Sequence, residues 1–163
     1  MNFAMTLKEF IESLEEQRQY KLALILTERA LCIWNNYTEL NKTEYRDSVV
    51  GMYHAVRKDI LFRTLETIKK ELANPKTQRE HIDRLREEFS DPIVAMQDLD
   101  WELPYPVERI FYAIRNFLDK LNGQDTTVFG EPQIYTVINQ AIDALETAEI
   151  LTEAEIKALL MSV

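Results

Sequence analysis

The spacing of the apolar residues is the feature that most constrains the fold. Apolar side chains recur at intervals of three and four residues along nearly the whole chain, and the strict alternation typical of half-buried strands is missing. This period predicts amphipathic helices. The chain has 163 residues, of which 46% are hydrophobic and only three are glycine, so it is long enough to bury one sizeable core. We therefore expect an all-α fold: a single-domain bundle of about seven helices over residues 1–163, around a long central helix.

Local signals indicate where these helices begin and end. A capping box, here Thr or Asn followed three residues later by Glu, marks a helix start. Such pairs begin at Thr6, Asn41, Thr77 and Thr152. Pro106 and Pro132 suit the first turn of a helix, and Gly123 suits a helix C-terminus.

The expected central helix spans residues 41–73. Its apolar positions wrap around more than one face, as in a helix with neighbours on both sides. Asn74-Pro75 would end it, because proline cannot continue a helix. A shorter helix would follow over residues 77–89, and Asp91-Pro92 would begin a separate turn or short helix.

The residue patterns of common catalytic and metal sites are missing. His54 and His81 have no Glu or His at the spacing of a helical metal site, and the three glycines are too scattered for a phosphate-binding loop. Cys32 is the single cysteine, so it can form neither an internal disulfide nor a multi-thiolate metal site. Because it lies beside an apolar stripe, we expect it to be a packing residue. We predict no cofactor, no metal and no catalytic residues.

Two polar residues keep a ligand-binding or enzymatic alternative open. Arg29 falls on the apolar stripe of a helix expected over residues 22–37, where an unpaired buried guanidinium would be costly. It would either extend to solvent or pair with a core carboxylate. His54 would be partly buried in the long helix. A pocket inside the bundle that contains both His54 and Arg29 would support this alternative.

The N-terminal residues and the cysteine content bear on location. Residues 1–10 lack the basic start and apolar run of a signal peptide, and no stretch approaches the roughly 18 apolar residues that span a bilayer. A single cysteine fits a reducing compartment. We therefore expect a cytoplasmic protein that does not bind membranes.

The charge is unevenly distributed. The formal net charge is −9, and residues 57–86 carry nine basic groups against five acidic ones, whereas residues 87–163 carry four basic groups against fifteen acidic ones. The basic stretch lacks the interleaved aromatic residues and the helix-turn-helix spacing of a nucleic-acid binder, and the overall negative field opposes such binding. The acidic C-terminal half instead favours a basic protein partner, although adjacent zones of opposite charge could also simply neutralise each other.

One irregular segment within the acidic half combines aromatic and acidic residues between prolines. Trp and Tyr supply large contact areas at low entropic cost, and flanking carboxylates suit a basic partner. The residues predicted to bind a partner are Asp98, Asp100, Trp101, Glu102 and Tyr105. The alternative for Trp101 is that it folds inward and holds the loop in place.

Residues 22–37, with Leu-Thr-Glu-Arg-Ala-Leu followed by Trp34 and Tyr37, resemble a helix found in uncharacterised all-helical bacterial families. In size, acidity and helical pattern the chain also resembles the all-α immunity proteins of bacterial polymorphic toxin systems. This resemblance implies a cytoplasmic protein that neutralises a cognate toxin by binding it, without chemistry of its own. It implies no specific residue roles.

The sequence thus favours a non-enzymatic binding protein with an acidic surface. Besides the ligand-binding alternative, a self-associating structural domain is open. Two copies would meet head to tail through their acidic and basic zones, or through an apolar helix face. The structure can test where the residues named for each function lie.

Overall fold

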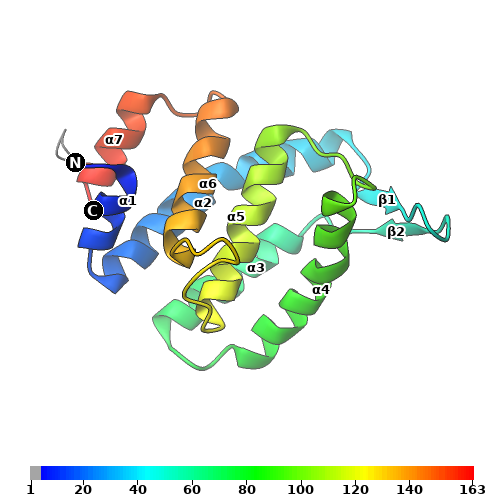
Figure 1. The fold of residues 1–163 in the computed structure, drawn as a ribbon, viewed down its shortest axis with the longest axis horizontal. Helices are drawn as coiled ribbons and strands as arrows, with labels where there is room; N and C mark the ends of the chain where they lie inside the picture. The colour runs from blue at the N-terminus through cyan, green and yellow to red at the C-terminus, as the bar shows by residue number, and fades with distance from the viewer. Residues whose placement is uncertain (1–4) are drawn as a thin grey trace.

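Seven helices and one two-stranded hairpin make up residues 5–163, the part of the chain that the computed structural model describes (Figure 1). The predicted all-α class is confirmed, with the small hairpin as an addition. In chain order the elements are α1 (Leu7–Ser13), α2 (Glu16–Leu40), β1 (Glu44–Arg46), β2 (Tyr53–Ala55), α3 (Ile60–Ala73), α4 (Arg79–Gln97), α5 (Tyr105–Leu121), α6 (Gln133–Thr147) and α7 (Glu153–Met161).

Several of the expected helix ends are confirmed. The hydroxyls of Thr6 and Thr152 each accept a hydrogen bond from the backbone N–H three residues later, and the Glu at that position completes both capping boxes. After α5, Gly123 adopts a φ of +95°, a left-handed conformation that glycine favours. The backbone N–H of Gln124 then reaches back to the carbonyl of Asp119 at 3.1 Å, which closes the C-terminal turn.

The expected long helix over residues 41–73 is wrong in its first half. Strands β1 and β2 form an antiparallel hairpin, and only α3 is helical, ending at Ala73 as expected. The turn between the strands is stabilised by Asp47, whose carboxylate accepts from the N–H of Val49 at 2.7 Å, and by Gly51, whose φ is +74°. At the base of the hairpin, Thr43 and Val56 exchange backbone and side-chain hydrogen bonds.

Two expectations for helix α4 are also wrong: the capping box at Thr77 and the break at Asp91-Pro92. The N-terminal cap of α4 is not a capping box at Thr77. The N-cap residue is Gln78, which makes no side-chain cap hydrogen bond. In the turn before the helix, the carboxylate of Glu71 accepts hydrogen bonds from the N–H groups of Lys76 and Gln78, at 2.8 and 3.0 Å. The helix then continues through Pro92, because burial of Pro92 and its neighbours against the core offsets the lost backbone bond.

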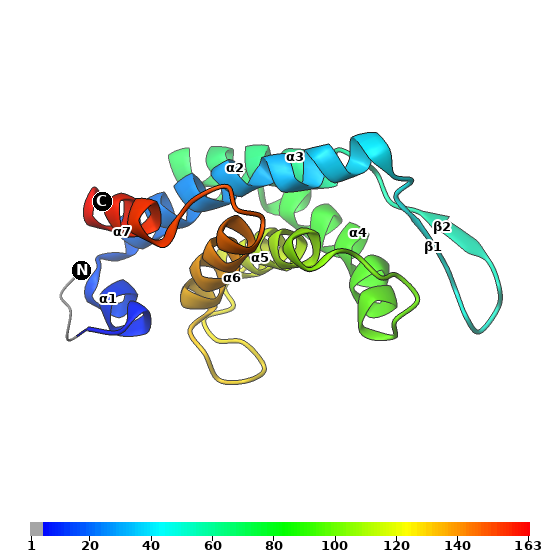
Figure 2. The same ribbon diagram turned by 90° about the horizontal axis from the view of Figure 1, so that it is seen from above.

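Helix α5 is the central element, in place of the helix expected over 41–73. It packs against α2, α3, α4 and α6, and residues on its inward face such as Ile110, Ile114 and Phe117 are fully buried. Helices α1 and α7 lie at one end of the molecule, and the hairpin projects from the opposite end (Figures 1 and 2). Within residues 5–163, no helix is long and apolar enough to cross a membrane.

An aromatic cluster joins the hairpin end to the bundle. The Phe111 ring on α5 lies 5.1 Å from Phe89, 5.4 Å from Trp34 and 5.7 Å from Trp101, measured between ring centroids. Trp101 in turn lies 5.8 Å from Tyr45 of β1. The five rings come from α2, β1, α4, the segment after α4 and α5. We infer that this cluster holds the hairpin in its position relative to the helices.

We expect Phe111→Ala to lower the free energy of unfolding by about 3–5 kcal/mol, because it leaves a cavity at the centre of this cluster. Urea denaturation followed by circular dichroism measures the loss. The matched control is Phe129→Ala, which removes the same side chain from a position that is 90% exposed and should change stability by less than about 0.5 kcal/mol. Equal losses in the two variants would contradict this assignment of the core.

Candidate functional site

The acidic segment after α4 lies against the hairpin. The carboxylate of Asp100 accepts a hydrogen bond from the backbone N–H of Ser48, in the hairpin turn, at 3.3 Å. A hollow of about 210 Å³ separates the turn from the end of α4. It is lined by Tyr45, Asp47, Val49, His54, Asp91, Val94, Ala95, Asp98 and Asp100. The structure therefore brings two of the predicted contact residues, Asp98 and Asp100, together with hairpin residues that were not predicted to be near them.

The backbone after α4 explains this placement. Leu99 adopts a positive φ of +61°, and the N–H groups of Asp100 and Trp101 both reach back to the carbonyl of Ala95, at 2.8 and 3.2 Å. This reversal turns Leu99 outward, where it is 72% exposed, and Trp101 inward. The carboxylates on either side of Leu99 consequently face solvent near the hairpin.

Trp101 lies in the core. Its side chain is 5% exposed and packs edge-on against Trp34 and Phe111. This burial confirms the alternative that Trp101 folds inward, and it leaves little of the side chain for the predicted contact with a partner. Tertiary partners on α2 and α5 decide its orientation, because a Trp buries more apolar area there than on a surface loop.

Tyr105 is exposed but faces a different part of the molecule. Its hydroxyl donates a hydrogen bond to the carboxylate of Asp143 on α6, and this bond raises the pKa of the Tyr105 hydroxyl. The guanidinium of Arg109 lies 5.5 Å from the centre of its ring.

Glu102 is exposed in the connection between α4 and α5. Of the five predicted residues, only Asp98 and Asp100 line the hollow beside the hairpin.

Large apolar side chains gather at the same end of the molecule. The hairpin turn exposes Val49 at 90%, and Val50, Met52 and Tyr53 are each more than half exposed. We call the following set the hairpin-end surface: apolar Val49, Val50, Met52, Tyr53, Val94 and Leu99, with carboxylates Glu44, Asp47, Asp91, Asp98, Asp100 and Glu102. It combines apolar side chains with a dense group of negative charges.

The electrostatics of this surface are strongly negative. Across the hairpin (43–56) and the segment 91–105, Arg46 is the one cationic Lys or Arg against the six carboxylates. The guanidinium of Arg46 is occupied locally, since its Nε donates to the carbonyl of Gly51 at 3.3 Å. Backbone N–H groups of Val49 and Val50 lower the pKa of Asp47, which keeps that carboxyl ionised in the turn.

The residues proposed for an enzymatic pocket are not brought together. His54 is partly buried as expected, but it lies on β2, where its ring stacks on Tyr45 with 5.2 Å between centroids. Arg29 is exposed on α2 and is not among the residues that line the hollow containing His54. It therefore needs no partner in the core. Cys32 is also exposed on α2, so the prediction that it is a packing residue is wrong.

Sequence reasoning missed the contribution of the hairpin to this surface. Its apolar residues from Val49 to Val56 happen to follow helical spacing, which concealed the turn. Asp47 followed four residues later by Gly51 is a turn signal that could have revealed it.

Comparison with known proteins adds no further constraint. No family model, curated protein or solved structure matches this chain. The functional conclusion therefore rests on the residues of the hairpin-end surface and their arrangement.

The hydrogen bonds at Asp47 predict a pH response of the hairpin turn. Because the folded pKa lies below the ordinary 3.8, ionised Asp47 stabilises the turn above that value, and the stabilisation disappears as the pH falls through the folded pKa. In an NMR titration, the amide signals of Val49 and Val50 should shift with a midpoint below 3.8. Asp47→Asn should remove the transition, whereas Asp83→Asn, an exposed change on α4, should preserve it. A midpoint at or above the ordinary value would contradict the assignment.

Proposed function

We propose that this protein is a non-enzymatic binding protein that docks a basic protein partner on its hairpin-end surface. The observation that carries the proposal is the exposure of several large apolar side chains in one turn, directly beside a group of carboxylates. Contiguous exposed apolar surface is uncommon on monomeric proteins away from sites of interaction.

The composition of the surface suits a protein interface. Apolar residues at the centre of an interface supply most of the affinity once they are desolvated, and a polar rim excludes water. Val49 and Leu99 project from the hairpin and from the end of α4, respectively, with Asp98 and Asp100 close by. The carboxylates would speed encounter with a positively charged partner and discriminate against acidic proteins.

A toxin-neutralising immunity protein is the form of this function that we propose. A toxin with a basic catalytic or nucleic-acid-binding cleft offers the complementary charge, and the resemblance in size, acidity and helical pattern to all-α immunity proteins supports this choice. Neutralisation would come from covering the cleft and would require no chemistry from this chain. A cytoplasmic location and a bacterial source are part of the same proposal.

A second candidate function is self-association. The observation that favours it is a groove of about 450 Å³ between α3 and α4, whose lining includes Arg57, Lys70, His81 and Arg84. The hairpin-end surface of another copy could enter this groove head to tail. Sedimentation analysis at low and high salt distinguishes the candidates, because a strict monomer at low salt excludes self-association.

Charge reversal tests the proposed docking surface. Affinity capture from an extract of the source organism would supply the bound protein, which is then purified and measured by surface plasmon resonance. The triple variant Asp98→Lys, Asp100→Lys and Glu102→Lys should slow association by tenfold or more and reduce its dependence on salt, because the attractive field is reversed. A second variant, Val49→Ser with Met52→Ser, should mainly speed dissociation, because it removes apolar contact area.

A matched control separates the surface from overall charge. Glu146→Lys, Glu149→Lys and Glu153→Lys change the net charge equally at exposed positions near the end of α6 and the start of α7. This control should retain most of the association rate. If the triple variant binds like the unmodified protein, or if both triple variants lose the same amount, the hairpin-end surface is not the docking site.

A further inference from the structure

A groove on another face of the molecule has the features of a ligand site. It has a volume of about 480 Å³ and lies along α5 and α6, bordered by the loop 122–132 that joins them. In Figure 2 this loop and the end of α4 project on the same side of α5. The lining residues that matter for the argument are Arg109, Tyr112, Arg115, Gln133, Tyr135 and Gln140.

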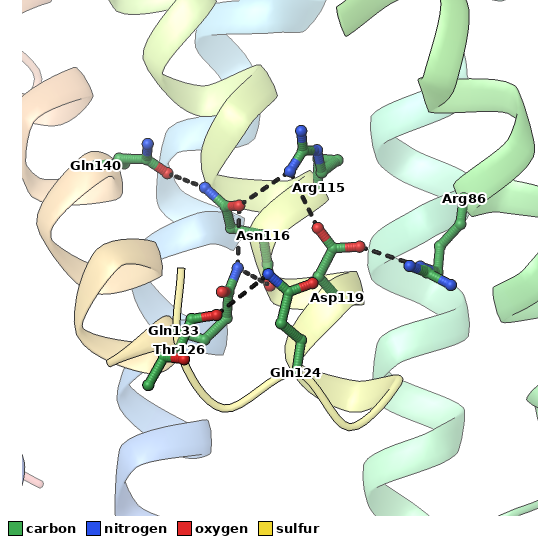
Figure 3. Close-up of polar contacts among 8 residues, drawn as sticks. All are labelled: Arg86, Arg115, Asn116, Asp119, Gln124, Thr126, Gln133 and Gln140. Carbon is green, nitrogen blue, oxygen red and sulfur yellow. Dashed lines mark hydrogen bonds and ion pairs between the residues drawn. The ribbon is translucent and has the colours of Figure 1, made fainter. Parts of the chain in front are cut away.

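A buried network of amide side chains forms one wall of the groove (Figure 3). Gln133 is fully buried, and its Nε2 donates to the backbone carbonyl and to Oδ1 of Asn116, at 3.2 and 3.0 Å. The Nδ2 of Asn116 in turn donates to Oε1 of Gln140 at 2.8 Å. Since a backbone carbonyl can only accept, the orientation of the Gln133 amide is fixed.

This orientation leaves one acceptor of the network without a donor. The Oε1 atom of Gln133 is buried and has no hydrogen-bond partner among residues 5–163. An unsatisfied buried acceptor costs about 1–3 kcal/mol, and each such group in a folded protein calls for a specific explanation. A ligand that donates an N–H to this oxygen would supply the missing bond.

Two arginines, Arg109 and Arg115, line the groove together with one carboxylate, Glu131, which pairs with Lys8 at 3.0 Å. Arg115 donates from one terminal nitrogen to Asp119 at 3.0 Å, and Arg86 reaches the other oxygen of the same carboxylate at 3.1 Å (Figure 3). Two guanidinium groups therefore share one carboxylate. Arg109, six residues before Arg115 on α5, pairs with Asp143 through Nε, at 3.2 Å and without the alignment of a hydrogen bond. Both lining arginines retain N–H donors for an anion.

Aromatic rings complete the groove. Tyr112 and Tyr135 line it, and burial raises the pKa of the Tyr112 hydroxyl, which stays neutral near pH 7.

The tip of the bordering loop exposes Val128 and Phe129, each at 90%. Gln124 and Thr126 of the same loop lie beside Gln133 (Figure 3), and Oε1 of Gln133 is buried, so a ligand reaches this oxygen only when side chains around it move.

We propose that this groove binds a small organic anion, a carboxylate or a phosphate ester, that also carries an N–H donor. The anionic group pairs with Arg109 and Arg115, the N–H donates to Oε1 of Gln133, and the rest of the ligand packs against Tyr112. The site is separate from the hairpin-end surface and does not depend on the function proposed there.

Titration of the isotopically labelled full chain tests this site by ¹H–¹⁵N NMR. The probes are uridine monophosphate, which has a phosphate and an imide N–H, and N-acetylglycyl-phenylalanine, which has a carboxylate and amide N–H groups. At millimolar concentration, at least one probe should shift the side-chain amide signals of Gln133 and Gln140 and the backbone signals of residues 124–131. If uridine monophosphate is a probe that binds, uridine, which lacks the phosphate, should bind at least tenfold more weakly.

Arginine variants provide the controls. Arg115→Gln should weaken binding about tenfold, the effect of losing one charge-assisted hydrogen bond, and Arg109→Gln should do the same if Arg115→Gln proves unstable by circular dichroism. Arg29→Gln, at an exposed position on α2, should leave affinity unchanged. The proposal is overturned if neither probe shifts these signals, or if the groove variant that folds binds as tightly as Arg29→Gln.

Discussion

The packing of Trp101 against Trp34, Tyr45 and Phe111 joins segments that are far apart in the chain. It connects α2, strand β1, the segment after α4 and the central helix α5. A two-stranded hairpin is only marginally stable by itself, so its position depends on this contact with the bundle. A hydrogen bond from the indole of Trp34 to the carbonyl of Lys58, at 2.7 Å, holds the chain between β2 and α3 in the same region.

This arrangement determines which groups remain at the surface. As Trp101 turns inward, the reversed backbone at Leu99 presents Asp98 and Asp100 to solvent beside the hairpin turn. The same packing buries one face of the hairpin through Tyr45 and leaves the turn exposed. The exposed apolar and acidic residues of the hairpin-end surface are thus brought together by the packing of the core. The groove along α5 and α6 is a separate consequence of the amide network between those helices.

Much of the helical framework could be predicted from the sequence, because its signals are local. Capping boxes at Thr6 and Thr152 and the turn at Gly123 depend on residues only a few positions apart. The hairpin could not be recognised from periodicity, because its exposed apolar residues share the three- and four-residue spacing of a buried helical stripe. The orientation of Trp101 was also beyond local reasoning, since its partners come from distant segments.

Hydrogen exchange of the hairpin amides tests most directly the claim that the aromatic cluster positions the hairpin-end surface. The N–H groups of Asp47 and Val56 donate within the hairpin, at 2.8 and 2.7 Å, and should be protected in the unmodified protein. In Trp101→Leu, loss of the aromatic contacts should speed their exchange by up to about tenfold relative to amides in α6. Hairpin amides that exchange like an unstructured chain, or that do not respond to Trp101→Leu, would contradict the account.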